Sequence, residues 1–163
     1  MRITLIRHAE AGDDAPRDEA RALTARGRQD ARRMGRGLAR RDVTFSLMVT
    51  SPLVRAVQTA EIVAAQVDYR GRILATDALV PEGPVSQIVS FLASLARDPE
   101  AVDSVALVAH EPILSALAAT LTRLPRHPPL KKAEALRIKM DGGPEGTGTL
   151  KWRVDARGRH DRL

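Results

Sequence analysis

The sequence predicts an α/β domain, a three-layer α/β/α sandwich with a mostly parallel central sheet and an antiparallel hairpin at its edge. Short, continuous apolar runs at 3–6, 47–50 and 105–109 are typical of parallel strands that are covered on both faces. Segments with helical periodicity lie between these runs, as expected when helices pack on both sides of a sheet. Near the end of the chain the apolar period changes from helical to alternating, which indicates the hairpin.

The first half of the chain is expected to hold two helices. After an exposed loop at 12–22, the first helix is expected over 23–41, where arginines cover the side opposite the apolar stripe. The second is expected over 51–67, with Ser51 as its N-cap and Pro52 at its first helical position. The stripe of the first helix is Gly27, Ala31, Met34 and Leu38, and that of the second is Leu53, Val57, Ala60, Ala64 and Val67.

Two further helices are expected in the second half. The third follows a short strand at 72–75 and the turn "PEGP" at 81–84. The fourth follows "HEP" at 110–112, with Pro112 at its start. Their apolar stripes are Val85, Ile88, Val89, Leu92 and Leu95 in the third, and Leu114, Leu117, Ala118 and Leu121 in the fourth.

The end of the chain predicts a hairpin and a tail. Apolar and charged residues alternate at 136–140 and at 150–154, and the loop "DGGPEGTG" at 141–148 joins them. We expect one domain over residues 1–155 and a disordered tail at 156–163.

Composition limits the class of protein. The 163 residues are 44% hydrophobic, which suits one globular core, and no apolar run approaches the roughly 20 residues that a bilayer requires. The chain has no cysteine, so disulfides and thiolate metal sites are excluded. Arg2 is the only charged residue before the first apolar run, and that run is too short for the hydrophobic region of a secretory signal. We therefore expect a cytoplasmic protein without a membrane partner.

The charge favours an anionic partner. The formal net charge is +6 and is carried mainly by arginine. Aromatic residues make up 2% of the chain, which argues against binding of single-stranded nucleic acid by base stacking. Nucleic acid is therefore not the expected partner.

Polar residues follow three of the predicted strands at the point where each strand ends. Arg7 and His8 follow the first, Ser51 and Arg55 follow the second, and His110 follows the run at 105–109. Ligands of open α/β sheets bind outside these carboxyl ends. Arg55 would lie in the first turn of its helix, where the helix dipole disfavours a cation unless an anion is bound there. Together with Arg7 it would form a pocket for a phosphoryl group.

The two histidines add reactive groups to this pocket. A neutral imidazole at His8 can attack phosphorus and form a covalent phosphohistidine. A second, protonated imidazole at His110 would stabilise the charge on the phosphoryl oxygens. Since arginine and histidine can neutralise the phosphate, we expect no metal and no cofactor.

Three motifs together resemble the histidine phosphatase superfamily. They are "LIRHAEA" at 5–11, "TSPLVRAVQTAE" at 50–61 and "LVAHEP" at 107–112. The short chain and the segment "LTARG" are similar to the small bacterial branch of the superfamily, the SixA-type phosphohistidine phosphatases. The resemblance extends over residues 1–124 and implies a phosphoglycerate mutase-like fold.

The resemblance also implies an activity and the residues that carry it. His8 is then the phosphoryl acceptor of a metal-independent phosphohistidine phosphatase, and Arg7, Arg55 and His110 form its phosphate pocket. The implied substrate is a phosphorylated protein of the histidine-containing phosphotransfer type, in a phosphorelay or a phosphotransfer system. The superfamily most often has glycine after the nucleophile, whereas this chain has Ala9.

Several roles stay open. Many superfamily members use a carboxylate as general acid, which the small branch largely lacks. Glu82 could be such an acid, and the protein would then act on small phosphate monoesters; its Pro and Gly neighbours favour an ordinary turn residue instead. Ser51 and Glu10 are further candidates for substrate binding.

Two other classes of protein compete with this interpretation. A metallohydrolase could use His8, Glu10, His110 and Glu111, although no pair of them has a recognised ligand spacing. A non-catalytic module that binds phosphate or nucleic acid is a remote alternative, which the basic charge allows.

Overall fold

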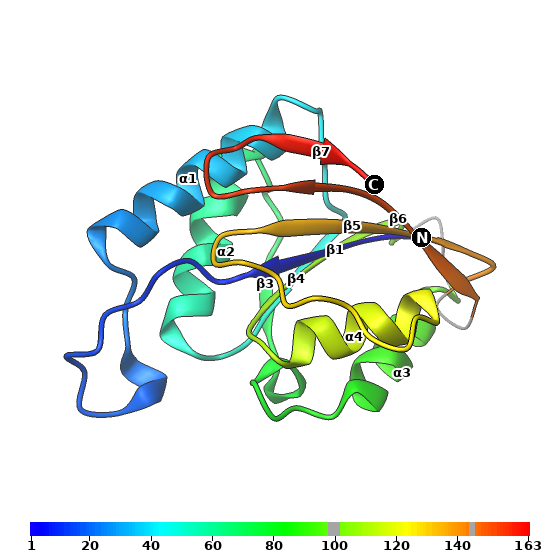
Figure 1. The fold of residues 1–163 in the computed structure, drawn as a ribbon, viewed down its shortest axis with the longest axis horizontal. Helices are drawn as coiled ribbons and strands as arrows, with labels where there is room; N and C mark the ends of the chain where they lie inside the picture. Colours follow the sequence, from blue (N-terminus) through cyan, green and yellow to red (C-terminus); the bar gives the residue numbers. More distant parts are fainter. Residues whose placement is uncertain (98–101, 144–145) are drawn as a thin grey trace.

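The structure is a computed structural model, which describes residues 1–97, 102–143 and 146–163 (Figure 1). Within these residues a seven-stranded sheet has the order β3-β2-β4-β1-β5-β6-β7. The strands are β1 (Arg2–Arg7), β2 (Leu47–Thr50), β3 (Ile73–Ala75), β4 (Ser104–Ala109), β5 (Ala135–Asp141), β6 (Thr147–Val154) and β7 (His160–Arg162). The helices are α1 (Ala25–Ala39), α2 (Val54–Gln66), α3 (Val85–Leu95) and α4 (Ile113–Thr122), with short 3-10 turns η1 (Asp18–Ala20) and η2 (Asp77–Leu79).

The sheet is parallel in its first four strands and antiparallel beyond them. The pairs β3–β2, β2–β4 and β4–β1 are parallel, whereas β5, β6 and β7 are added antiparallel. Helices α1 and α2 cover one face and α3 and α4 cover the other (Figure 1). The predicted fold class, with its parallel core and antiparallel edge strands, is confirmed.

Each face of the sheet has its own apolar core, because alternate residues of one strand face opposite sides. In β1, Ile3 and Leu5 pack towards α3 and α4, whereas Ile6 packs towards α1 and α2. In β4 the neighbours Val105 and Ala106 are divided in the same way. All five are fully buried, which explains why the sequence shows continuous rather than alternating apolar runs.

Helix α1 agrees with the predicted stripe, and its start is fixed by two contacts. The Thr24 hydroxyl accepts a hydrogen bond from the Gly27 N–H at 2.9 Å, as an N-cap residue does. Gly27 lies against the backbone of Glu10, where a Cβ atom would be 2.0 Å from the Glu10 carbonyl oxygen. The helix therefore docks on the segment that directly follows His8.

Helix α2 begins later than predicted. It starts at Val54, and its N-cap residue is Leu53, which makes no side-chain cap. The prediction of Ser51 as N-cap is wrong, because the helix begins three residues after Ser51, whose hydroxyl contacts His110 and accepts a hydrogen bond from the Leu53 N–H at 3.3 Å. The buried stripe is also rotated: Ala60 and Ala64 belong to it as predicted, whereas Val57 and Val67 are half-buried. The side chains that replace them in the interior are Arg55, Ala56, Thr59 and Val63.

Helices α3 and α4 agree with the sequence more closely. Ile88 and Leu92 are the buried residues of α3, and its other stripe members pack at the margin of the same core. In α4, Pro112 is the N-cap, and the four predicted stripe residues are all buried. No helix in the described part of the chain is long and apolar enough to cross a membrane.

The predicted disordered tail at 156–163 is contradicted, because residues 160–162 form β7 and pair with β6. A tight turn makes this return possible: Gly158 has a φ of +73°, and the Asp155 carboxylate accepts hydrogen bonds from the Arg157 and Arg159 N–H groups. The hairpin of β5 and β6 is thus followed by one more strand at the edge. Residues 144–145 of its predicted loop lie outside the described residues.

Candidate active site

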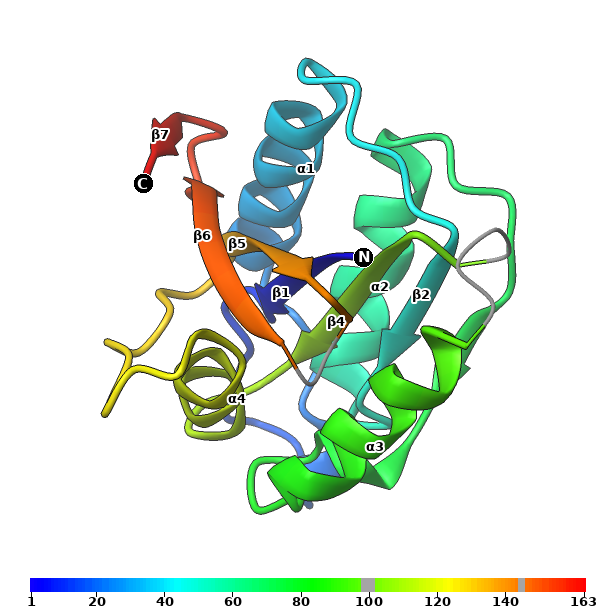
Figure 2. The same ribbon diagram turned by 90° about the vertical axis from the view of Figure 1, so that its right-hand side faces the viewer.

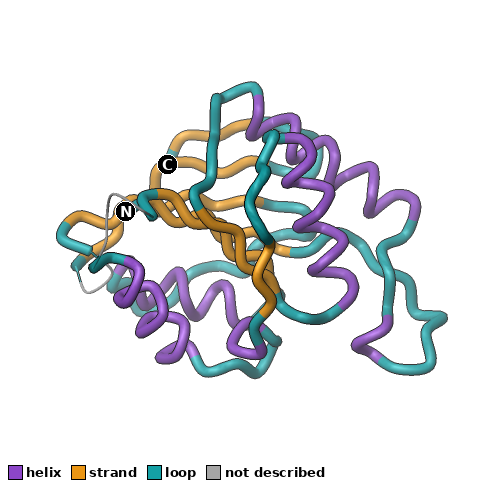
Figure 3. Tube along the Cα trace, turned by 180° about the vertical axis from the view of Figure 1, so that it is seen from behind, coloured by secondary structure: helices purple, strands orange, loops and turns teal. Residues whose placement is uncertain are grey.

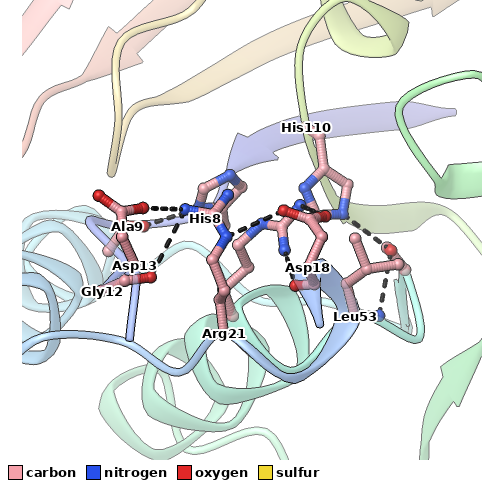
Figure 4. Close-up of polar contacts among 10 residues, drawn as sticks. His8, Ala9, Gly12, Asp13, Asp18, Arg21, Leu53 and His110 are labelled. Carbon is pink, nitrogen blue, oxygen red and sulfur yellow. Dashed lines mark hydrogen bonds and ion pairs between the residues drawn. The ribbon is translucent and has the colours of Figure 1, made fainter. Parts of the chain in front are cut away.

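The site is built where β1 and β4 end side by side. Arg7 is the last residue of β1 and pairs with Ala109, the last residue of β4. His8 and His110 therefore follow the two strands at the same edge of the sheet, and their ring centroids are 4.9 Å apart. Figure 4 shows the two rings next to each other, with Asp18 and Arg21 of the projecting loop opposite them.

His8 is held as a neutral imidazole with a defined tautomer. Its Nδ1 atom lies 2.6 Å from the Ala9 carbonyl oxygen, and because a carbonyl only accepts, Nδ1 carries the proton. Burial lowers the pKa of His8 to about 4, with the positive charges of Arg55 and Arg7 acting in the same direction. At neutral pH the Nε2 atom thus keeps its lone pair, as a nucleophile requires.

His110 is also neutral. Its Nε2 atom and the Ser51 hydroxyl are hydrogen-bonded at 2.8 Å. Burial first, and then the charges of the neighbouring His8 and Arg55, lower the pKa of His110 to about 3. The expected protonated second histidine is therefore corrected: burial beside two arginines disfavours its charge until an anion is present.

Both arginines of the site use some of their guanidinium N–H groups in hydrogen bonds within the protein. Arg7 donates from Nη1 to the Leu130 carbonyl oxygen at 2.6 Å. Arg55, only 3% exposed, donates to the Asp18 carbonyl oxygen at 2.8 Å and to its carboxylate at 3.0 Å. In the described residues, Arg7 Nε, Arg55 Nε and His110 Nδ1 are buried and have no hydrogen-bond partner. Unsatisfied buried nitrogens of this kind are costly, and phosphoryl oxygens would satisfy them.

Thr59, one turn after Arg55, links the elements of the site. Its hydroxyl accepts a hydrogen bond from the Ala9 N–H at 3.1 Å and donates to the Arg55 carbonyl oxygen at 2.7 Å. Gln58 accepts from the Leu23 N–H at 2.7 Å and so ties the chain before α1 to α2. Helix α2 thereby fixes the segment that carries His8 as well as its own arginine.

Asp18 was missed by the sequence reasoning. The segment 12–22 was expected to be an exposed loop, and it does project from one end of the molecule (Figure 3). Its turn η1 nevertheless brings the Asp18 carboxylate onto Arg55 and, at 2.9 Å, onto Arg21. These contacts, that from Arg55 first, hold the pKa of Asp18 below its ordinary value. A single carboxylate in a loop of mixed charge gives no periodic signal that could have identified it.

Two other candidate residues make no described contact with the histidines. Glu10 accepts a hydrogen bond from the Thr24 hydroxyl at 2.9 Å, so it supports the start of α1. Glu82 is exposed in the turn between η2 and α3, and among the described contacts it has none with His8 or His110. Ser51, by contrast, is fully buried against His110.

The four residues of the metallohydrolase alternative point to different partners. Glu111 accepts hydrogen bonds from the Ser115 hydroxyl at 2.6 Å and from the Leu130 N–H at 2.8 Å, whereas Glu10 is engaged with Thr24. Within the residues described, no three His, Asp or Glu side chains are grouped so that they could hold a metal ion. The arrangement around His8 instead combines two guanidinium groups with two imidazoles, which suits an oxyanion.

Comparison with known sequences agrees with this geometry. The sequence profile of the histidine phosphatase superfamily (branch 1) matches residues 3–79. The phosphohistidine phosphatase SixA of Escherichia coli (strain K12) is 29% identical over 154 residues, which cover 94% of this chain and 93% of that protein. The mitochondrial serine/threonine-protein phosphatase Pgam5 of Drosophila persimilis is 36% identical over 81 residues, but these cover only 28% of its length.

Known structures extend the likeness to the fold. The structure of the protein histidine phosphatase SixA complexed with tungstate superposes with a TM-score of 0.88 at 28% identity, covering 96% of this chain and 97% of the other. A mycobacterial glucosyl-3-phosphoglycerate phosphatase with inorganic phosphate reaches a TM-score of 0.74 at 19% identity, which shows a shared fold. The likeness to SixA thus includes nearly the whole of both chains.

Proposed function

Because the chain belongs to the histidine phosphatase superfamily, branch 1, and is a homologue of SixA, we propose that it hydrolyses phosphohistidine on a protein. The proposed reaction needs no metal ion and passes through a covalent phosphohistidine at His8. The observation that carries the proposal is the neutral His8 ring. Its Nδ1–H donates a hydrogen bond to the Ala9 carbonyl oxygen, and its Nε2 lone pair stays free. The similarity to SixA over nearly the whole chain supports the substrate class.

The first step of the proposed reaction transfers the phosphoryl group. His8 Nε2 attacks phosphorus, and the bond from phosphorus to the substrate's ring nitrogen breaks. Arg7 and Arg55 would donate their free N–H groups to the phosphoryl oxygens as charge develops there, and His110 would donate from Nδ1 in the tautomer whose Nε2 accepts from the Ser51 hydroxyl. A substrate imidazole that is protonated on its other nitrogen leaves as neutral imidazole, so no general acid is required.

The second step releases phosphate. Water attacks the phosphorus bound to His8, the P–N bond breaks, and the electron pair returns to Nε2. The proton lost by the water passes to the phosphate dianion or to solvent. Between turnovers His8 is again neutral at pH 7, because its pKa is lowered to about 4.

The alternative of a small phosphate monoester as substrate would need an acid for the alkoxide that leaves. Glu82 is exposed in a turn, away from the contacts that join His8, His110 and Arg55, so the geometry favours the phosphoamide substrate. A non-catalytic phosphate-binding module would not need the His8 tautomer that the Ala9 contact fixes.

The experiment that tests this proposal compares two substrates in EDTA. We expect release of phosphate from a phosphohistidine-bearing phosphotransfer protein, little turnover of a sugar phosphate, whose leaving group is an alkoxide, and no loss of either rate in Glu82→Gln. Higher activity on the ester that Glu82→Gln abolishes would establish the monoesterase alternative. Binding of phosphate without turnover of either substrate would identify the non-catalytic module.

A further inference from the structure

A second group of cations lies at the opposite end of the sheet from His8. Figure 2 looks onto this end, where the N-terminus of β1 meets β5 and β6. A hollow of about 220 Å³ opens there between the strands and the chain that follows α1. We call it the basic hollow, and its principal lining residues are Arg2, Arg41, Arg137, Lys139, Lys151 and Trp152.

Arg137 is the buried residue of the basic hollow. The alternation of β5 places it on the face opposite Leu136 and Ile138, and that face is covered, so Arg137 is only 5% exposed. Its guanidinium carbon lies 5.1 Å from the ring centroid of Trp152 and 5.8 Å from that of Phe45. The alternation at 136–140 therefore places a charged side chain in the interior, between two aromatic rings.

The charge of Arg137 is poorly compensated. Nη1 donates to the Ser104 hydroxyl at 3.1 Å, but Nε has no partner, and in the described parts of the chain no carboxylate forms an ion pair with it. Burial and then the charge of Arg2 lower the pKa of Arg137 to about 10, while the carboxylate of Asp103 acts in the opposite direction, so Arg137 remains a cation at neutral pH. A buried cation without a direct ion pair is costly, because the Asp103 carboxylate is engaged with Arg2, and a bound anion would offset that cost.

The neighbouring Thr4 hydroxyl, like Arg137 Nε, is a buried polar group without a hydrogen-bond partner in the described structure. Thr4 lies opposite Arg137 in the pairing of β1 with β5, so the two side chains share one face of the sheet. Its hydroxyl is fully buried and lacks a hydrogen-bond partner among the residues described. Two adjacent strands thus present an unsatisfied buried polar group on the side of the basic hollow.

Of the four exposed cations of the basic hollow, two form ion pairs and two do not. Arg2 forms an ion pair with Asp103, and Lys139 forms one with Asp141 at 3.2 Å. Arg41 and Lys151 have no ion pair with any described carboxylate, although Asp42 also lines the hollow. Positive charge therefore exceeds negative charge around the buried guanidinium.

We propose that the basic hollow is a binding site for a small phosphate-type polyanion, with Arg137 as its buried anchor and Arg41 and Lys151 as its outer cations. The planar guanidinium fork and the ammonium group suit phosphate oxygens. The volume is below the roughly 300 Å³ at which drug-sized ligand pockets begin, which limits the ligand to a small anion such as diphosphate. The site is separate from the phosphoryl pocket, because β1 runs from Arg2 at one to Arg7 at the other.

Trp152 provides a direct readout, since it is the only tryptophan of the chain and it lines the basic hollow. We titrate the protein with diphosphate at constant ionic strength and follow tryptophan fluorescence. The expected result is a saturable change in wild type and a dissociation constant about tenfold higher in the double variant Arg41→Gln/Lys151→Gln. The matched control Arg32→Gln/Arg36→Gln removes two exposed arginine charges from α1 and is expected to bind as wild type does.

The same titration separates this site from the phosphoryl pocket. Arg55→Gln, which alters that pocket, should leave the Trp152 response unchanged. Arg137→Met should lose the rise in Tm that diphosphate gives wild type, without lowering Tm in diphosphate-free buffer. A wild type that shows no saturable response, or equal dissociation constants in the two double variants, would overturn the proposal whether or not Arg137→Met folds.

Discussion

At the scale of single residues, the unpaired nitrogens and the neutral histidines of the site suit an oxyanion. Three buried nitrogens, on Arg7, Arg55 and His110, have no partner within the described residues, and both histidines are neutral because burial and the arginines disfavour their charge. A bound oxyanion would supply hydrogen-bond acceptors for the unpaired nitrogens and a negative charge that favours protonation of the histidines. The electrostatics of ligand-free and occupied site should therefore differ measurably.

Tungstate should raise the pKa values of the site histidines. The dianion would favour the charged imidazole, so we expect the pKa of His110 to rise from about 3 by at least about one unit. NMR titration of the imidazole resonances with and without tungstate measures this, and the half-buried His127, which has no described contact with the site, is the internal control. An unchanged His110 pKa at saturating tungstate would place the anion away from this residue.

Asp18 competes with the anion for Arg55. Its carboxylate lies 3.0 Å from Arg55 Nη2 and is 60% exposed, so substrate can displace it. In Asp18→Asn the amide oxygen can still accept from Arg55 while the opposing charge is removed. We expect tungstate to inhibit this variant at concentrations about threefold to tenfold lower than for wild type.

The inhibition constant of tungstate also tests the opposite role for Asp18. Weaker inhibition of Asp18→Asn would show that the carboxylate holds Arg55 in place rather than opposing the anion. Asp13→Asn is the matched control, since Asp13 contacts Arg21 at 2.8 Å but forms no ion pair with Arg55 in the described structure.

At the scale of elements, the site depends on how α1 and α2 dock on the segment after β1. Periodicity alone predicts α1 and its buried stripe, because that stripe is uninterrupted and Thr24 caps it. The start of α2 could not be predicted in the same way. Ser51 has the composition of an N-cap, but the structure uses its hydroxyl for His110, and only tertiary contact decides between these uses.

At position 27 the close packing of α1 against the segment after β1 leaves no space for a side chain. Alanine normally favours a helix over glycine, but here its Cβ would be 2.0 Å from the Glu10 carbonyl oxygen. We expect Gly27→Ala to lower the free energy of unfolding by about 1–3 kcal/mol and to lower kcat by shifting the His8 segment. Urea denaturation and the phosphatase assay measure the two effects.

Gln29→Ala is the control for this prediction, because Gln29 is exposed on the same helix. Its free energy of unfolding should stay within about 0.5 kcal/mol of that of wild type. If Gly27→Ala were as stable as Gln29→Ala, α1 could move without cost, and the close contact with Glu10 would not position the site.

At the scale of the whole molecule, the sequence predicts the layers and the strand ends better than it predicts what covers the edges. Arg7, His8 and His110 could be placed together because their strands are short, apolar and parallel. The strand β7 could not be predicted, because its three polar residues give no apolar pattern and their return to the sheet depends on the turn at Gly158. Arg137 was unpredictable for a related reason, because alternation identifies the opposite face of a strand but not whether it is covered.

The buried histidines make the stability of the whole fold dependent on pH. The pKa values of His8 and His110 are lowered to about 4 and about 3 from an unfolded value of 6.5, so between these limits the unfolded state binds more protons. Stability is thus complete above about pH 6.5 and falls as the pH decreases towards 4, by on the order of a few kcal/mol. Urea denaturation across this range measures the loss.

His110→Gln tests the origin of this pH dependence. Glutamine cannot take up a proton but can bond to Ser51, so the variant should lose less stability than wild type between pH 6.5 and pH 4. An unchanged slope would show that His110 titrates normally in the folded protein.

The central claim is that His8 carries the phosphoryl group between substrate and water. The most direct measurement is rapid quenching of the protein during turnover of a radiolabelled phosphohistidine-bearing phosphotransfer protein in EDTA, followed by mapping of the label. We expect an acid-labile, base-stable label on His8 in wild type, and in His8→Ala no label and a rate at least about a thousandfold lower. Undiminished phosphate release by His8→Ala, or label on another residue, would contradict the account.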